Sequence, residues 1–243
     1  FFATSRDPLK RSQYGATIGG PVRKDKVFFF FGYQGTCLRS ETGGLSSYVP
    51  TDANLAGDFS SLLSAGNPNN PLGRAVTLRD PLTLQPLANN QIPLASLDPA
   101  SLNLAKNWLP RAGGSGLTFY SRPLAQNFNE VTAKVDYNFS ANDRLMVRFF
   151  RDGFDQPGTL VNNNLLTYND FSTIVAISSV VRETHIFSPR MLNEFGFGIV
   201  PESDRRGPPS NAPSRQRLGV QNYFPPSVPS VESINVSGFF NVG

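Results

Sequence analysis

Ten consecutive residues, 130–139, alternate strictly between polar and apolar side chains, and this alternation constrains the fold more than any other feature. The apolar members are Val131, Ala133, Val135, Tyr137 and Phe139, and the polar members are Glu130, Thr132, Lys134, Asp136 and Asn138. A period of two places successive side chains on opposite faces of a β-strand. The segment is therefore predicted to be a strand with one apolar and one polar face.

The same pattern resumes at Leu145, Val147 and Phe149, after a short run of turn-forming residues. Two alternating runs across a short polar turn predict a β-hairpin. If both apolar sets face one side, the loop must hold an odd number of residues, and we expect 140–144 to form it. The predicted cross-strand pairs are Phe139 with Leu145, Tyr137 with Val147, and Val135 with Phe149.

Six strands are predicted in all, near 14–22, 27–35, 129–139, 144–151, 173–187 and 190–200. They pair as three hairpins with short polar turns. The connections 36–127, 152–172 and 201–238 are long and rich in Pro, Asn and Gly. Within the first of them, Asp98 as a cap, Pro99 at the first helical position and Pro110 as a stop predict a short surface helix. Short and long loops thus alternate, as in an outer-membrane barrel.

Residue usage gives little support to catalysis or metal binding. The chain has one cysteine, Cys37, and one histidine, His185, so a disulfide, a cysteine metal site and the usual general-base arrangements are not expected. Glu183 and His185 share a strand face but fall short of the usual number of metal ligands. No catalytic residue, cofactor-binding residue, metal site or enzymatic activity is predicted. The net charge of +4 comes from dispersed basic residues, which argues against nucleic acid as a partner.

Two architectures fit the alternation. In a membrane a strand of about 9 to 11 residues spans the hydrocarbon, provided that a closed barrel pairs its backbone groups. In a soluble β-sandwich the same apolar face packs against a second sheet. The second architecture would suit a surface-exposed adhesin or glycan-binding module. A sandwich predicts that the apolar faces of the strands meet one another, whereas a barrel predicts a continuous outward apolar band.

Six runs, taken in order, resemble the barrel region of Oar-like TonB-dependent outer-membrane transporters. They are GATIGGPVRKDKVFFFFGYQG (15–35), VPTDANLAGDFS (49–60), RDPLT (79–83), NNQIPLASLDP (89–99), VTAKVDYNFSANDRLMVRFF (131–150) and THIFSPRMLNEFGFG (184–198). The resemblance implies an all-β, antiparallel transmembrane β-barrel segment with long extracellular loops, located in the bacterial outer membrane. Residues 1–243 would form part of the receptor's barrel domain and supply about six strands of a larger barrel.

The resemblance also implies partners and an activity. The partners would be outer-membrane lipid, the protein's own plug domain, a TonB-type energy-coupling complex and an unknown bulky ligand that crosses the membrane. The N-terminal regulatory-like domain and the plug would lie outside this chain.

In such a barrel the alternation separates lipid-facing from lumen-facing side chains. The lipid-facing candidates are Val131, Val135, Tyr137, Phe139, Leu145, Val147 and Phe149. The lumen-facing candidates are Lys134, Asp136 and Arg148, which would either contact plug or substrate or form a charge ladder that stabilises the inner wall.

Overall fold

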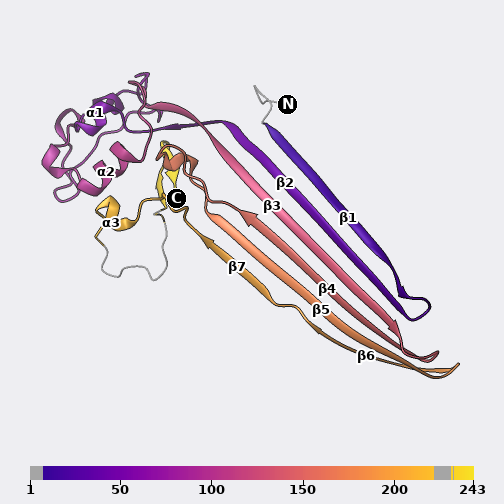
Figure 1. Cartoon of the computed structure of the whole chain (residues 1–243). Coiled ribbons are helices and arrows are strands. Elements are labelled where there is room, and N and C mark those ends of the chain that lie inside the picture. The colour runs from indigo at the N-terminus through magenta and orange to yellow at the C-terminus, as the bar shows by residue number, and fades with distance from the viewer. Residues whose placement is uncertain (1–7, 222–230, 232) are drawn as a thin grey trace.

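The predicted strands form one antiparallel sheet in the computed structural model, which describes residues 8–221, 231 and 233–243 (Figure 1). In chain order the strands are β1 (Leu9–Arg23), β2 (Val27–Tyr48), β3 (Leu117–Asn138), β4 (Asp143–Gln156), β5 (Phe171–Ser188), β6 (Met191–Ile199) and β7 (Glu202–Gly207). Each of the first five pairs with the next one along the chain, and β7 pairs with β5. The predicted all-β antiparallel fold is confirmed.

The last strand position of the sheet is shared by β6 and β7. Both pair with β5, β6 along its C-terminal half and β7 along its N-terminal residues. Between them, Ile177 donates a backbone hydrogen bond to the carbonyl of Pro201 (3.0 Å). Proline lacks an N–H group and so interrupts the ladder here. The chain therefore occupies six neighbouring strand positions, with the sixth broken at Pro201.

The β-sandwich alternative is wrong. All six strand positions belong to one sheet, so their apolar faces lie side by side and do not meet. The second sheet in the described part of the chain is the small hairpin of β8 (Ile234–Val236) and β9 (Phe240–Val242). Val242 of this hairpin packs in a core at the loop end of the molecule. This hairpin therefore does not form the second layer that a sandwich requires.

In the β3–β4 hairpin, each residue of β3 pairs two residues earlier on β4 than predicted. The structure pairs Tyr137 with Leu145, Val135 with Val147, and Ala133 with Phe149. The loop between the paired residues Asn138 and Arg144 is 139–143, which starts one residue earlier than predicted. Its length is odd, as predicted, so the two apolar sets still share a face.

Ser140 explains this register. Its side-chain oxygen accepts hydrogen bonds from the backbone N–H groups of Asn142 and Asp143, both at 3.1 Å. The backbone N–H of Phe139 donates to the carbonyl of Asp143 (3.0 Å). Serine commonly closes turns in this way, by bonding backbone groups two or three residues ahead. Residues 140–142 thus form the tip of the turn, and the last pair of the ladder is Asn138 with Arg144.

The predicted boundaries of the long connections are wrong, because the strands extend further than the alternation does. Residues 36–48 continue β2 and pair with 117–128 of β3, which leaves 49–116 as the first connection. The second connection shrinks from 152–172 to 157–170. The predicted loop 201–238 contains β7, a helical turn and β8, and its residues 222–230 and 232 lie outside the described residues.

The physical reason is that alternation appears only where one face meets an apolar medium. Where both faces of a sheet meet water, polar side chains suit both, and the period-two signal disappears. The outer half of β2, for example, contains Arg39, Ser40, Glu41 and Thr42, which give no apolar face. Strand pairing is maintained there by backbone hydrogen bonds, which depend little on side-chain hydropathy.

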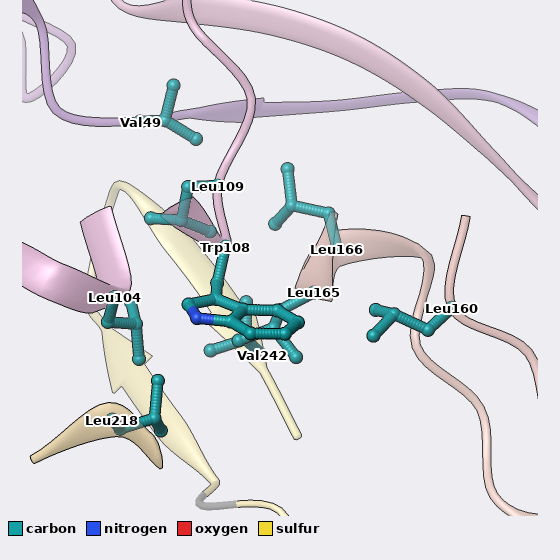
Figure 2. Close-up of a cluster of buried hydrophobic side chains, with 9 residues drawn as sticks. All are labelled: Val49, Leu104, Trp108, Leu109, Leu160, Leu165, Leu166, Leu218 and Val242. Carbon is teal, nitrogen blue, oxygen red and sulfur yellow. The ribbon is translucent and has the colours of Figure 1, made fainter. Parts of the chain in front are cut away.

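The connections fold together into a cap at the end of the sheet away from the short turns (Figure 1). Its helices are α1 (Asp52–Leu55), α2 (Pro99–Asn107) and α3 (Arg215–Leu218), with short 3₁₀ turns at 60–63, 88–90, 94–96 and 165–167. The buried core of the described residues lies in this cap and consists of Val49, Leu104, Trp108, Leu109, Leu160, Leu165, Leu166, Leu218 and Val242 (Figure 2). The cap is a packed unit built from segments far apart in the sequence.

Helix α2 begins where the sequence predicts. Asp98 accepts a hydrogen bond from the backbone N–H of Ser101 (2.7 Å), and Pro99 occupies the first turn. The helix is not only a surface element, because Leu104 is buried and Trp108 directly follows the last helical residue. Helix α2 therefore anchors the first connection to the core of the cap.

Candidate functional site

The structure places the predicted lipid-facing residues together on one side of the sheet, here called the apolar face. Val131, Val135 and Tyr137 of β3 align with the odd-numbered residues of β4, among them Leu145, Val147 and Phe149. Phe139 lies just beyond β3, with its ring centroid 4.2 Å from that of Tyr137. All seven residues thus contribute to one surface.

The apolar face continues across the neighbouring strands. The registers add Ile18 of β1, Phe29 and Phe31 of β2, Val181 of β5, and Phe195, Phe197 and Ile199 of β6. Most of these side chains are substantially exposed, for example Phe31 at 43% and Phe197 at 63%. Contiguous exposed apolar surface of this extent marks contact with a membrane or another protein.

The predicted lumen-facing residues lie on the opposite side of the sheet, here called the polar face. Lys134 Nζ contacts Asp136 Oδ2 at 2.8 Å, and Arg148 is the residue directly opposite Lys134. Further along this face, Arg182 Nε lies 3.3 Å from Glu194 Oε1. Like charges directly opposite each other are unfavourable, and Asp136 offsets the Lys134–Arg148 pair. The polar face carries both signs of charge in close contact.

The short turns are staggered along the sheet in a regular way. The β1–β2 turn is centred on Asp25, and the next residue, Lys26, accepts a backbone hydrogen bond from Asn138 (2.8 Å). The registers therefore place the β3–β4 turn, centred on Ala141, about two residues further along the strands. The β5–β6 turn at Pro189 lies about two residues further again.

The tilt of the strands follows from this stagger. If all short turns lie at the same height along the barrel axis, each strand is shifted along its neighbour by about one residue, or about 3.3 Å, over a strand spacing of about 4.8 Å. The corresponding tilt from the axis is about 35°, the value that barrel closure requires. The hairpins are thus offset as in the wall of a barrel.

The cap contains an apolar pocket of about 480 Å³. Its lining includes Leu55, Phe59 and Leu62 from the first connection, Leu102 of α2, and Phe240 of β9. A volume of this size falls within the range of small-molecule sites, which are mostly apolar with a few polar groups. Hydrogen bonds from the backbone and side chain of Ser101 hold the pKa of Asp98, at the pocket margin, below its usual value.

One cluster of potential metal ligands on the apolar face was not identified from the sequence. Glu183 and His185 of β5 share this face, as the sequence predicts, and the fold adds Asp143 directly opposite His185. These three residues are the one group in the described part of the chain with converging potential metal ligands. The sequence alone did not assign Asp143 to this cluster, because that assignment requires the register between β4 and β5.

No helix in the described part of the chain is long and apolar enough to cross a membrane.

Comparison with known proteins gives one match. A family model described as "Outer membrane beta barrel domain" matches residues 1–243. No curated protein and no solved structure matches the chain.

Proposed function

The chain belongs to the family of outer membrane beta barrel domains, and we propose that it forms part of the wall of an Oar-like TonB-dependent transporter. It is located in the bacterial outer membrane. The transporter would move a bulky ligand across that membrane, coupled to a TonB-type complex and gated by its own plug domain. No enzymatic activity, cofactor or nucleic-acid partner is part of this function.

The observation that supports the proposal is a two-faced sheet that extends far beyond its apolar band and ends in a folded cap. Strand β3 has 22 residues, which at about 3.3 Å per residue and a tilt of about 35° rise roughly 60 Å. The apolar band of an outer-membrane barrel is only about 25 Å tall. More than half of the wall therefore stands outside the hydrocarbon and holds the cap where a large ligand first arrives.

The two faces take different roles in this proposal. Val131, Val135, Tyr137, Phe139, Leu145, Val147 and Phe149 face lipid. Lys134, Asp136 and Arg148 face the lumen, where their paired charges form a polar wall against the plug or the passing ligand. Short turns and the aromatic pair of Tyr137 and Phe139 would lie at the periplasmic boundary, where aromatic girdles are found.

Energy coupling is the feature that separates this transporter from a passive porin. The full-length protein, reconstituted in phospholipid vesicles, is expected to exclude small sugars in a swelling assay, because a plug closes the lumen. In cells, deletion of the gene and deletion of the TonB-type protein are expected to abolish uptake or export of the same bulky compounds, compared by mass spectrometry of the medium.

Either of two results would contradict the proposal. Free swelling in small sugars would identify an open pore. Transport that depends on the gene but not on the TonB-type protein would identify a passive channel.

A further inference from the structure

Three potential metal ligands converge at the short-turn end of the apolar face. Asp143 is the first residue of β4, and Glu183 and His185 lie two residues apart on β5. One ligand atom from each residue lies within 4.8 Å of the other two. His185 Nδ1 is 2.5 Å from Asp143 Oδ1, and all three residues are only partly exposed. The chain brings together one imidazole and two carboxylates from adjacent strands.

Strand geometry explains the convergence. Ile186 donates a backbone hydrogen bond to the carbonyl of Asn142 (2.9 Å), so Asn142 and Ile186 form a hydrogen-bonded pair of the ladder. The next pair, Asp143 and His185, is then a non-hydrogen-bonded pair. Side chains of such pairs lie closer together than those of hydrogen-bonded pairs. Glu183 follows on the same face because the side-chain period of a strand is two residues.

Neighbouring groups fix two of the three side chains. The hydroxyl of Ser140 contacts Asp143 Oδ2 at 2.5 Å, which leaves Oδ1 directed toward the imidazole. The His185 ring lies edge-on to Phe187, with the ring centroids 4.3 Å apart. Ligands whose orientation is fixed in advance lose less conformational freedom on binding a metal. The cluster is therefore preorganised by its own turn and strand.

The charge of the cluster is poorly balanced without a cation. The cross-strand neighbours of Glu183 on this face are Leu145 and Phe195, both apolar. At the edge of an apolar band, a carboxylate with apolar neighbours is costly. A divalent cation bound to two carboxylates and a neutral imidazole gives a site with no net charge.

We propose that Asp143, Glu183 and His185 bind a divalent transition-metal ion of the Zn²⁺ type. Zn²⁺ accepts imidazole nitrogen and carboxylate oxygen at about 2.0 to 2.2 Å, and three protein ligands with one open position are a common arrangement. Ca²⁺ and Mg²⁺ prefer sites made of oxygen alone, so the imidazole favours the transition metals. Asn193 of β6, opposite His185 in the register, lies on the side from which a further oxygen ligand could come.

The test measures metal binding to the full-length protein, purified in detergent without a polyhistidine tag. Zn²⁺ affinity is determined by competition with a chromophoric chelator, and bound Co²⁺ is followed by its visible absorption. The wild type is expected to bind one Zn²⁺ more than the variants His185→Gln, Asp143→Asn and Glu183→Gln. Each variant is expected to weaken binding at this site at least tenfold. Heat-modifiable gel mobility shows that each variant is folded.

The matched control is Glu194→Gln, which removes a carboxylate from the polar face of the adjacent strand β6 and should leave Zn²⁺ binding unchanged. Equal Zn²⁺ binding by the wild type and the three ligand variants would overturn the proposal. So would stronger binding of Ca²⁺ than of Zn²⁺ at the site. Because the measurement needs neither the transported ligand nor energy coupling, its outcome is independent of the transport function.

Discussion

Val135→Arg tests which face of the sheet meets lipid. Val135 lies between Phe29 of β2 and Val147 of β4, near the centre of the apolar band of β3, and is 43% exposed in the isolated sheet. If this surface faces hydrocarbon, arginine near the midplane should reduce the free energy of unfolding by about 2 to 4 kcal/mol. The folding equilibrium constant would then fall roughly 30- to 900-fold.

If the same surface faced water, the cost would be much smaller. Replacing a half-exposed strand residue in water changes stability by about 1 kcal/mol or less. The two environments therefore predict different magnitudes for one substitution, and the difference exceeds the usual uncertainty of a denaturant titration.

Thr132→Arg is the matched control. Thr132 belongs to the same strand but lies on the polar face, between Gly32 of β2 and Phe150 of β4, so the new side chain would project into the lumen of the proposed barrel. The expected cost is within about 1 kcal/mol, since lumen-facing positions tolerate charge. Both variants of the full-length protein are unfolded by denaturant in phospholipid vesicles, and the folded fraction is read from heat-modifiable gel mobility. Equal costs, or a larger cost for Thr132→Arg, would refute the assigned orientation.

Three further predictions concern the cap. Trp108→Ala removes a side chain that is 3% exposed in the cap core, so the free energy of unfolding of the cap should fall by about 3 to 5 kcal/mol. The cap should then become sensitive to protease, while the barrel keeps its heat-dependent shift in gel mobility. Unchanged protease resistance would show that the cap core is not needed. Gly57 has a φ of +89°, and Gly57→Ala would place a Cβ against the carbonyl oxygen of Ile92. This variant should destabilise the first connection by more than about 1 kcal/mol. Gly66 faces open space, so the control Gly66→Ala should keep wild-type protease resistance. The hydrogen bonds at the start of α2 lower the pKa of Asp98 in the folded state. The contribution of Asp98 to stability is therefore complete above its unfolded-state pKa of about 3.9 and is lost as the pH falls through the lower folded-state pKa. Protease sensitivity of the wild-type cap should rise in that acidic range, and Asp98→Asn, which caps the helix without titrating, should remove this pH dependence.

Much of the membrane-spanning half of the sheet could be predicted from local sequence. Alternation in 130–139 and at 145–149 identified the apolar face, because a side chain's face depends only on its parity along the strand. The turn at Ser188 and Pro189 was visible for a similar reason, since proline does not fit a central strand. The start of α2 at Asp98 also followed from local hydrogen-bond chemistry.

The outer half of the wall and the candidate metal site could not be predicted in this way. Residues 36–48 have polar side chains on both faces, and their pairing with 117–128 joins backbone groups 69 to 92 positions apart. The approach of Asp143 to His185 requires the register between two strands separated by a 14-residue connection. Local patterns contain no information on such distant pairings unless the intervening turns are already known.

The sequence by itself determined which residues share a face, where the hairpins turn and that the chain is built from antiparallel strands. Those properties follow from side-chain parity and from the chemistry of residues within a few positions of one another. The tertiary structure decided the exact register, the length of the strands and the packing of Val49, Trp108, Leu166 and Val242 into one cap core. The register and strand lengths depend on backbone hydrogen bonds between distant segments, and the cap core depends on which distant side chains exclude water from each other. Both form only when the whole chain folds.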